Sequence, residues 1–80
     1  MYGWEFYDVE TLDKKTDNFI KVENYTTIGE AKDYIKHTLE MKCLDYNEKL
    51  VLIKRHYDNN RELTYEETLG EYDYKGEIKC

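Results

Sequence analysis

Proline is absent from this 80-residue sequence, and glycine occurs only four times. Segments rich in these residues mark linkers and low-complexity regions, so neither can be drawn here. The glycines Gly3, Gly29, Gly70 and Gly76 are also scattered, which excludes a glycine-rich loop of the kind that cradles a phosphate. The length is that of one small domain. We therefore expect residues 1–80 to fold as a single domain.

Serine is absent as well, and cysteine occurs only at positions 43 and 80. A catalytic nucleophile needs a neighbouring base and an orienting group, and the sequence offers no such arrangement. Adjacent carboxylates arise by chance in a chain with 18 Asp and Glu residues. The residues that could bind zinc lack the paired spacing of zinc sites: His37, Cys43, His56 and Cys80. We expect no enzyme, no catalytic residue, no metal and no cofactor.

Long hydrophobic runs and positive charge are also scarce. The longest apolar run, residues 50–53, is far too short to span a membrane, and the first residues do not resemble a signal peptide. Twelve Lys and Arg against 18 Asp and Glu give a net charge of −6, which opposes contact with nucleic acid or anionic lipid. Two cysteines fit a reducing compartment. We expect a cytoplasmic protein, in the host cell if a phage encodes it, that binds neither nucleic acid nor membrane directly.

Residues 27–41 give the clearest pattern of secondary structure. Thr27 and Glu30 form a capping box, which predicts the start of a helix. One apolar stripe follows at helical spacing: Ile28, Ala31, Ile35 and Leu39. A single amphipathic helix must bury this stripe against other elements, so we expect a sheet beneath it.

Strand patterns lie on both sides of this helix. Residues 2–11 alternate in polarity, residues 12–18 suit a turn, and residues 19–25 resume a strand. Residues 49–57 contain an aliphatic run typical of an interior strand covered on both faces. Residues 58–60 favour a turn into a strand over 61–67, which can continue to Tyr72 with Gly70 at a bulge or bend. The side chains expected beneath the helix are Trp4, Phe6, Ile20, Val22, Leu50, Leu52 and Leu63.

The predicted fold is therefore α+β, with the order ββαββ and one helix on one face of a four-stranded, mainly antiparallel sheet. Residues 74–80 carry no clear pattern. The uncovered face should receive several of the residues Tyr7, Tyr25, Tyr57 and Tyr65. Tyrosine covers exposed sheets because of its β-propensity, and it is also enriched at interfaces, so both interpretations stay open.

Negative charge is concentrated at the two ends of the sequence. Residues 1–13 carry four acidic and no basic side chains, and residues 62–77 carry six acidic side chains against Lys75 alone. These ends form one acidic surface if their strands are neighbours. Acidic ends can also serve solubility alone. The candidate partner-binding residues are Glu5, Asp8, Glu10, Glu62, Tyr65, Glu66, Glu67, Glu71, Tyr72 and Asp73.

A small, acidic, tyrosine-rich, proline-free domain that ends in GEYDYKGEIKC resembles the phage and mobile-element proteins that block host defence, including anti-CRISPR proteins. The resemblance is one of composition over the whole chain. It implies stoichiometric inhibition of a CRISPR effector or another nuclease by a DNA-like acidic surface that occupies a basic channel. The alternative is a homo-oligomeric structural or regulatory module, such as a homodimer, that uses the tyrosine face. An enzyme or small-ligand binder is the third interpretation.

Overall fold

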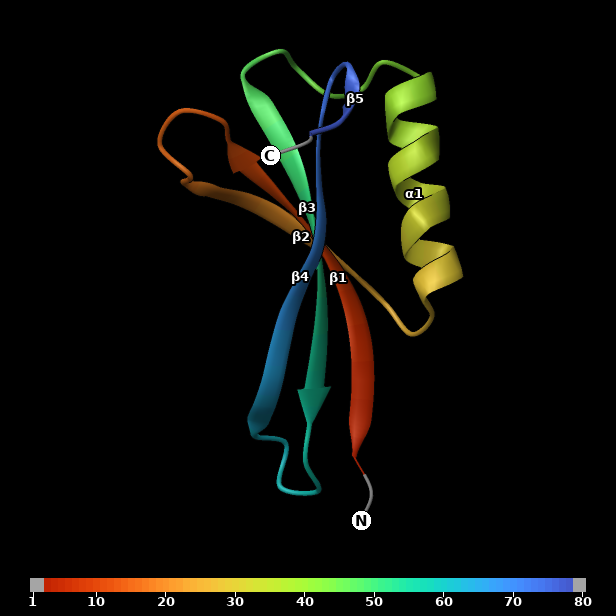
Figure 1. Ribbon diagram of the computed structural model, residues 1–80, viewed down its shortest axis with the longest axis vertical. Coiled ribbons are helices and arrows are strands. Elements are labelled where there is room, and N and C mark those ends of the chain that lie inside the picture. Colours follow the sequence, from red (N-terminus) through yellow and green to blue (C-terminus); the bar gives the residue numbers. More distant parts are fainter. Residues whose placement is uncertain (1–2, 79–80) are drawn as a thin grey trace.

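The computed structural model describes residues 3–78, which form one helix and an antiparallel sheet of five strands. The strand order across the sheet is β2-β1-β3-β4-β5 (Figure 1). The α+β class and the single helix on an antiparallel sheet are as predicted. The predicted count of four strands is wrong, because the C-terminal segment adds a short fifth strand. No helix within residues 3–78 has the length and apolar character needed to cross a membrane.

The first hairpin joins β1, Trp4–Asp13, to β2, Phe19–Tyr25. Asp13 ends β1 and accepts hydrogen bonds from the backbone N–H groups of Lys15 and Thr16. These bonds stabilise the turn, and Asp17 completes it in the left-handed conformation, with φ 61°. The predicted strand at residues 2–11 is therefore shifted: β1 extends two residues further, and residue 2 lies outside the described part.

Helix α1 runs over Ile28–Glu40, with Thr27 as N-cap and Met41 as C-cap. The Thr27 hydroxyl accepts a hydrogen bond from the Glu30 backbone N–H, so the predicted helix start is confirmed. The Glu30 carboxylate contacts the hydroxyls of Thr26 and Thr27. Of the predicted stripe, Ala31 and Ile35 are buried and Leu39 packs against the core, whereas Ile28 is 39% exposed.

Strand β3, Glu48–Tyr57, lies at the centre of the sheet, as its aliphatic run predicted. All four residues of that run, Leu50–Ile53, are buried. Leu50 and Leu52 belong to the core beneath α1, which also contains Val9 and Leu44. Because side chains alternate along a strand, Val51 and Ile53 lie on the opposite face of the sheet, which we call the open face.

The second hairpin joins β3 to β4, Leu63–Asp73, and β4 is followed by β5, Gly76–Glu77. The left-handed residue of its turn is Arg61, with φ 64°, rather than one of the predicted positions 58–60. Gly70 and Thr68 oppose the consecutive residues Leu52 and Ile53, so Leu69 is an extra residue that forms the predicted bulge.

The faces of β1 are the reverse of those predicted. Val9 is fully buried beneath α1, and Tyr7 packs against the same core. By alternation, Trp4 and Phe6 lie on the open face, and Trp4 is 46% exposed. Three other side chains expected beneath the helix are also exposed, namely Ile20, Val22 and Leu63. Of the tyrosines expected on the uncovered face, Tyr7 and Tyr25 instead contact the core.

In addition, α1 is shorter than the strands it covers. Thirteen helical residues span about 20 Å, whereas strands of ten or eleven residues span about 33 Å. Consequently β1, β3 and β4 continue beyond the end of α1 (Figure 1). We call this uncovered extension the arm. It consists of residues 4–7, 54–57 and 63–68 together with the turn at 58–62.

Candidate functional site

Arg55 organises the carboxylates on the open face. Its guanidinium donates from Nη1 to Asp8 at 2.7 Å, from Nη2 to Glu10 at 2.9 Å and from Nε to Glu66 at 2.6 Å. Asp8 and Glu10 come from β1 and Glu66 comes from β4, on either side of β3. Acidic residues from the two ends of the sequence therefore meet across β3, although their strands are not neighbours.

The electrostatics of this cluster follow from its partial burial. Burial would lower the pKa of Arg55, but the hydrogen bonds to Glu66, Asp8 and Glu10 outweigh it and raise that pKa above its ordinary value. Asn24 of β2 also donates a hydrogen bond to Asp8, which is buried. One guanidinium among three carboxylates leaves a net charge of −2. The hydrogen bonds to Arg55 hold the three carboxylates at fixed positions.

The opposite face of the arm carries a second and more exposed group. Glu5 lies 3.7 Å from both Lys54 Nζ and His56 Nδ1. The Tyr65 hydroxyl donates to Glu67 at 2.8 Å, and this bond raises the pKa of Tyr65. Exposed pairs of this kind stabilise a fold little. They do place two carboxylates and a half-exposed tyrosine on one side of the arm.

The remaining predicted partner-binding residues lie apart from these two groups. Glu71 contacts Lys49 at 3.4 Å, and Asp73 contacts Lys14 at 3.0 Å. Tyr72 packs against the core beneath α1 and so presents little of its ring to a partner. Glu62 lies in the exposed turn that follows β3. The structure thus brings Asp8, Glu10 and Glu66 together on the open face and Glu5, Tyr65 and Glu67 together on the opposite face, and it separates the other four.

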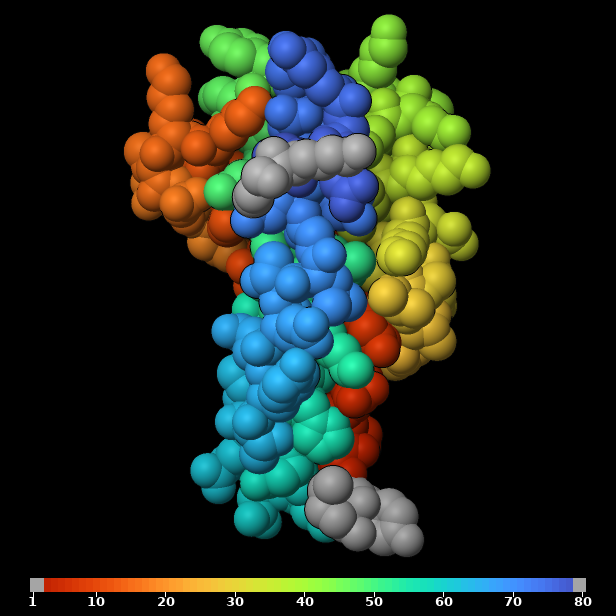
Figure 2. Space-filling model, in the orientation of Figure 1, coloured from red at the N-terminus to blue at the C-terminus, as the bar shows by residue number. Residues whose placement is uncertain are grey.

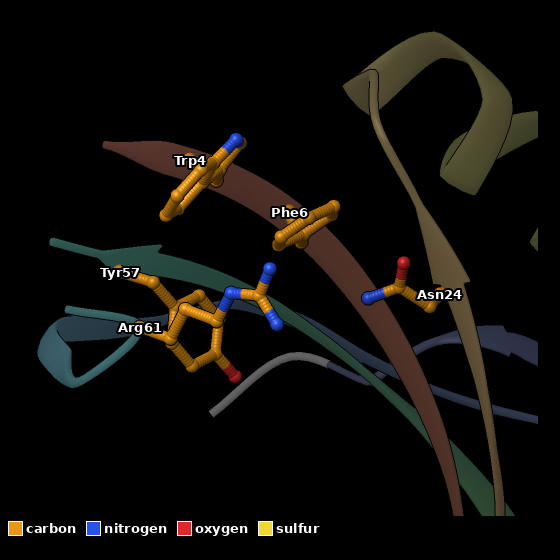
Figure 3. Close-up of a pocket in the computed structure, with 5 residues that line it drawn as sticks. All are labelled: Trp4, Phe6, Asn24, Tyr57 and Arg61. Carbon is orange, nitrogen blue, oxygen red and sulfur yellow. The ribbon is translucent and has the colours of Figure 1, made fainter. Parts of the chain in front are cut away.

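An aromatic hollow of about 490 Å³ lies at the end of the arm and was missed from the sequence. Figure 3 shows its lining: Trp4 and Phe6 from β1, Asn24 from β2, Tyr57 from β3 and Arg61 from the turn. Phe6 and Tyr57 make an edge-to-face contact with centroids 5.9 Å apart. The alternation of Trp4 and Phe6 was the available signal, but it was assigned to the wrong face.

Arg61 enters this hollow from an unusual backbone position. Its φ of 64° is one that Asn or Gly adopts more readily, and Asn59 and Asn60 directly precede it. The guanidinium extends beneath Phe6 toward Asn24 (Figure 3). Among residues 3–78, no carboxylate forms an ion pair with Arg61. The hollow therefore combines aromatic surfaces with one available cation.

Groups that could support metal chemistry are not assembled in the part of the chain that the structure describes. Within residues 3–78, no three His, Cys, Asp or Glu side chains are grouped so that they could hold a metal ion. The arrangement that is present can instead bind another molecule through fixed charge and aromatic contact. In comparisons with known proteins, no family model, no curated protein and no solved structure matches this chain.

Proposed function

We propose that this chain is a small protein-binding module that engages a basic protein through its arm. The observation that carries the proposal is the projection of β1, β3 and β4 beyond α1, with both faces uncovered by other described elements. Large side chains are exposed there, namely Trp4, Leu63 and Tyr65. Exposed apolar groups gathered in one region and bordered by charge are typical of interaction sites.

The proposed partner is a nucleic-acid-handling protein, such as a CRISPR effector or another host-defence nuclease, and the proposed action is stoichiometric inhibition. The carboxylates around Arg55 support this proposal because they hold negative charge at set positions, as a nucleic-acid backbone does. Such a surface is complementary to a basic channel and speeds association with it. The aromatic hollow would add packed contacts that slow dissociation.

The alternative proposal is a homo-oligomeric structural or regulatory module that uses a tyrosine-rich sheet face. Tyr7 and Tyr25 are engaged with the core, and Tyr65 lies on the opposite side of the sheet from Tyr57. A continuous tyrosine face is therefore lacking, which favours the acidic arm over this alternative.

Affinity capture from a bacterial lysate, followed by mass spectrometry and binding kinetics, tests the proposal. The baits are the wild type, Glu66→Lys with Glu67→Lys on the arm, and Asp33→Lys with Glu40→Lys on α1 as a control with the same change in charge. We expect the wild type and the helix control to retain the same basic protein and the arm variant to lose it. The wild-type association rate should also fall as salt rises.

Equal capture by all three baits would reject the acidic arm as the binding surface. Binding that resists salt and survives the arm substitutions, but fails when Tyr57 is replaced by Ala, would favour the tyrosine-face alternative. Size-exclusion chromatography of the wild type would then be expected to show a dimer.

A further inference from the structure

The outer edge of β4 is unpaired along most of its length. Its inner edge pairs with β3, whereas β5 pairs only with Tyr72 and Asp73. One further hydrogen bond, from the Ile78 N–H to the Glu71 carbonyl, ends the contact on that side. Within residues 3–78, nothing pairs with the outer edge of residues 63–68. Residues 65–68 form the regular part of this edge and offer about 13 Å of backbone N–H and C=O groups, which is enough to pair with a short strand.

This edge carries only part of the usual protection against pairing with another chain. Lysine and proline are common on protected edges, and β4 contains neither. The bulge at Leu69 lies above the open segment, whereas a second extra residue, Thr64, lies within it, so the regular part of the open edge is residues 65–68. Residues 63–69 are all exposed. Figure 2 shows β4 as a continuous strip of surface from the lower turn up to β5.

The side chains along this edge favour one kind of occupant. Glu66 faces the open side and Glu67 faces the other side, so each face of the edge carries a carboxylate. A second copy of β4 would bring the carboxylates of both chains close together, and like charges on adjacent strands are destabilising. An extended segment with basic side chains would instead meet opposite charge on both faces.

We propose that the outer edge of β4 takes an extended basic segment of the partner protein as an additional strand. Two consecutive Lys or Arg residues of that segment would lie beside Glu66 and Glu67, one on each face of the sheet. The inference rests on the proposed function and adds the mode of contact. Backbone hydrogen bonds to residues 63–68 supply affinity, and the two carboxylates select the partner.

The test uses a synthetic peptide as the probe: a capped octapeptide in which two central lysines are flanked by alternating threonine and valine. Two matched peptides carry N-methyl groups at the odd or at the even positions. Each methylated peptide keeps its charge and side chains but loses the backbone N–H donors along one of its two edges. Binding to the ¹⁵N-labelled wild-type chain is followed by NMR titration.

We expect the unmethylated peptide to bind and to shift the amide signals of residues 63–68. The peptide methylated on the pairing edge should bind at least about tenfold more weakly, and the other methylated peptide should retain binding. Glu66→Gln with Glu67→Gln should weaken binding of the unmethylated peptide, whereas Asp33→Asn with Glu40→Gln on α1 should leave that binding unchanged.

Equal affinity of all three peptides would overturn strand addition while leaving an acidic binding surface in place. An absence of binding at about 1 mM of the unmethylated peptide would also overturn it. Neither outcome decides the proposed function, which the lysate capture tests separately. Conversely, if the peptides bind in the expected pattern but all three baits capture the same protein equally, the β4 edge is kept as a strand-binding site and the acidic arm is rejected as the surface that captures that protein.

Discussion

Replacing Arg55 by methionine tests whether this residue holds the open face together. The substitution keeps most of the aliphatic stem and removes the guanidinium. Asp8, Glu10 and Glu66 then face one another without a cation. The Asp8 and Glu10 side chains are 7% and 19% exposed, so water can solvate them only in part, whereas Glu66 is 47% exposed.

The expected loss of stability follows from these exposures. Removing one partner of a fully buried ion pair costs about 3–5 kcal/mol. Because Glu66 and part of Glu10 remain solvated, we expect the free energy of unfolding to fall by about 2–4 kcal/mol. In a domain of this size each kcal/mol corresponds to about 4–8 °C, so the melting temperature should fall by at least about 8 °C.

Urea denaturation followed by far-UV circular dichroism measures this loss, and Lys54→Met is the matched control. Lys54 is the preceding residue, and its contact with Glu5 is long and exposed, so we expect a change within about 1 kcal/mol. Adding Asp8→Asn to Arg55→Met should restore part of the lost stability, because it removes the most buried unpaired charge. Equal midpoints for the two methionine variants would refute the reasoning.

Two further predictions concern the core and the first turn. Ile35→Ala should cost about 2–5 kcal/mol because this α1 side chain is buried in the core between the helix and the sheet. Ile28→Ala at an exposed site of the same helix should cost clearly less. Equal urea midpoints for the two variants would show that the wrong face of the helix was assigned to the core. Hydrogen bonds from the backbone N–H groups of Thr16 and Lys15 lower the pKa of Asp13 below its ordinary value of 3.8. The Asp13 carboxylate therefore contributes its full stabilisation at pH values above 3.8, and this stabilisation is lost as the pH falls through the lowered pKa. Asp13→Asn keeps a hydrogen-bond acceptor but does not titrate. The difference in unfolding free energy between wild type and variant should therefore narrow as the pH falls from about 5 to about 2. Urea midpoints of the two proteins that stay parallel over this range would contradict the prediction.

Features determined by neighbouring residues could be predicted from the sequence. The start of α1 depends on Thr27 and Glu30, which are three residues apart, and the interior position of β3 is indicated by one aliphatic run. Both predictions are confirmed. The bulge near Gly70 belongs to the same class, because a glycine inside a strand pattern is a local signal.

The assignment of faces could not be made in the same way. Alternation along β1 separates Trp4 and Phe6 from Tyr7 and Val9, but it does not say which set meets the helix. The two large aromatic residues were placed in the core because of their size. The deciding fact was which face of the sheet α1 covers, and that face carries Tyr7 and Val9.

The cluster around Arg55 depended on pairing between distant segments. Asp8 pairs with Ile53 and Arg55 pairs with Glu66, and this register brings side chains 47 residues apart within 2.7 Å. The sequence indicated that acidic residues are concentrated at both ends. It did not indicate that one arginine would bind acidic residues from both ends. Strand β5 was missed because two residues give no periodicity. Gly76, which adopts a φ of 124° at the start of this strand, was the local sign of a turn there.

The extra residue Leu69 lies where the half of the sheet beneath α1 meets the arm. Above it Leu52 pairs with Gly70, and below it Ile53 pairs with Thr68, so these pairs would persist in a chain without it. A bulge bends its strand and increases the local twist. The course of β4 from the core into the arm is therefore bent at a position separate from the core residues and from the groups that the arm displays. Deletion of Leu69 would thus change the bend of β4 at this point while the pairs on both sides keep their faces.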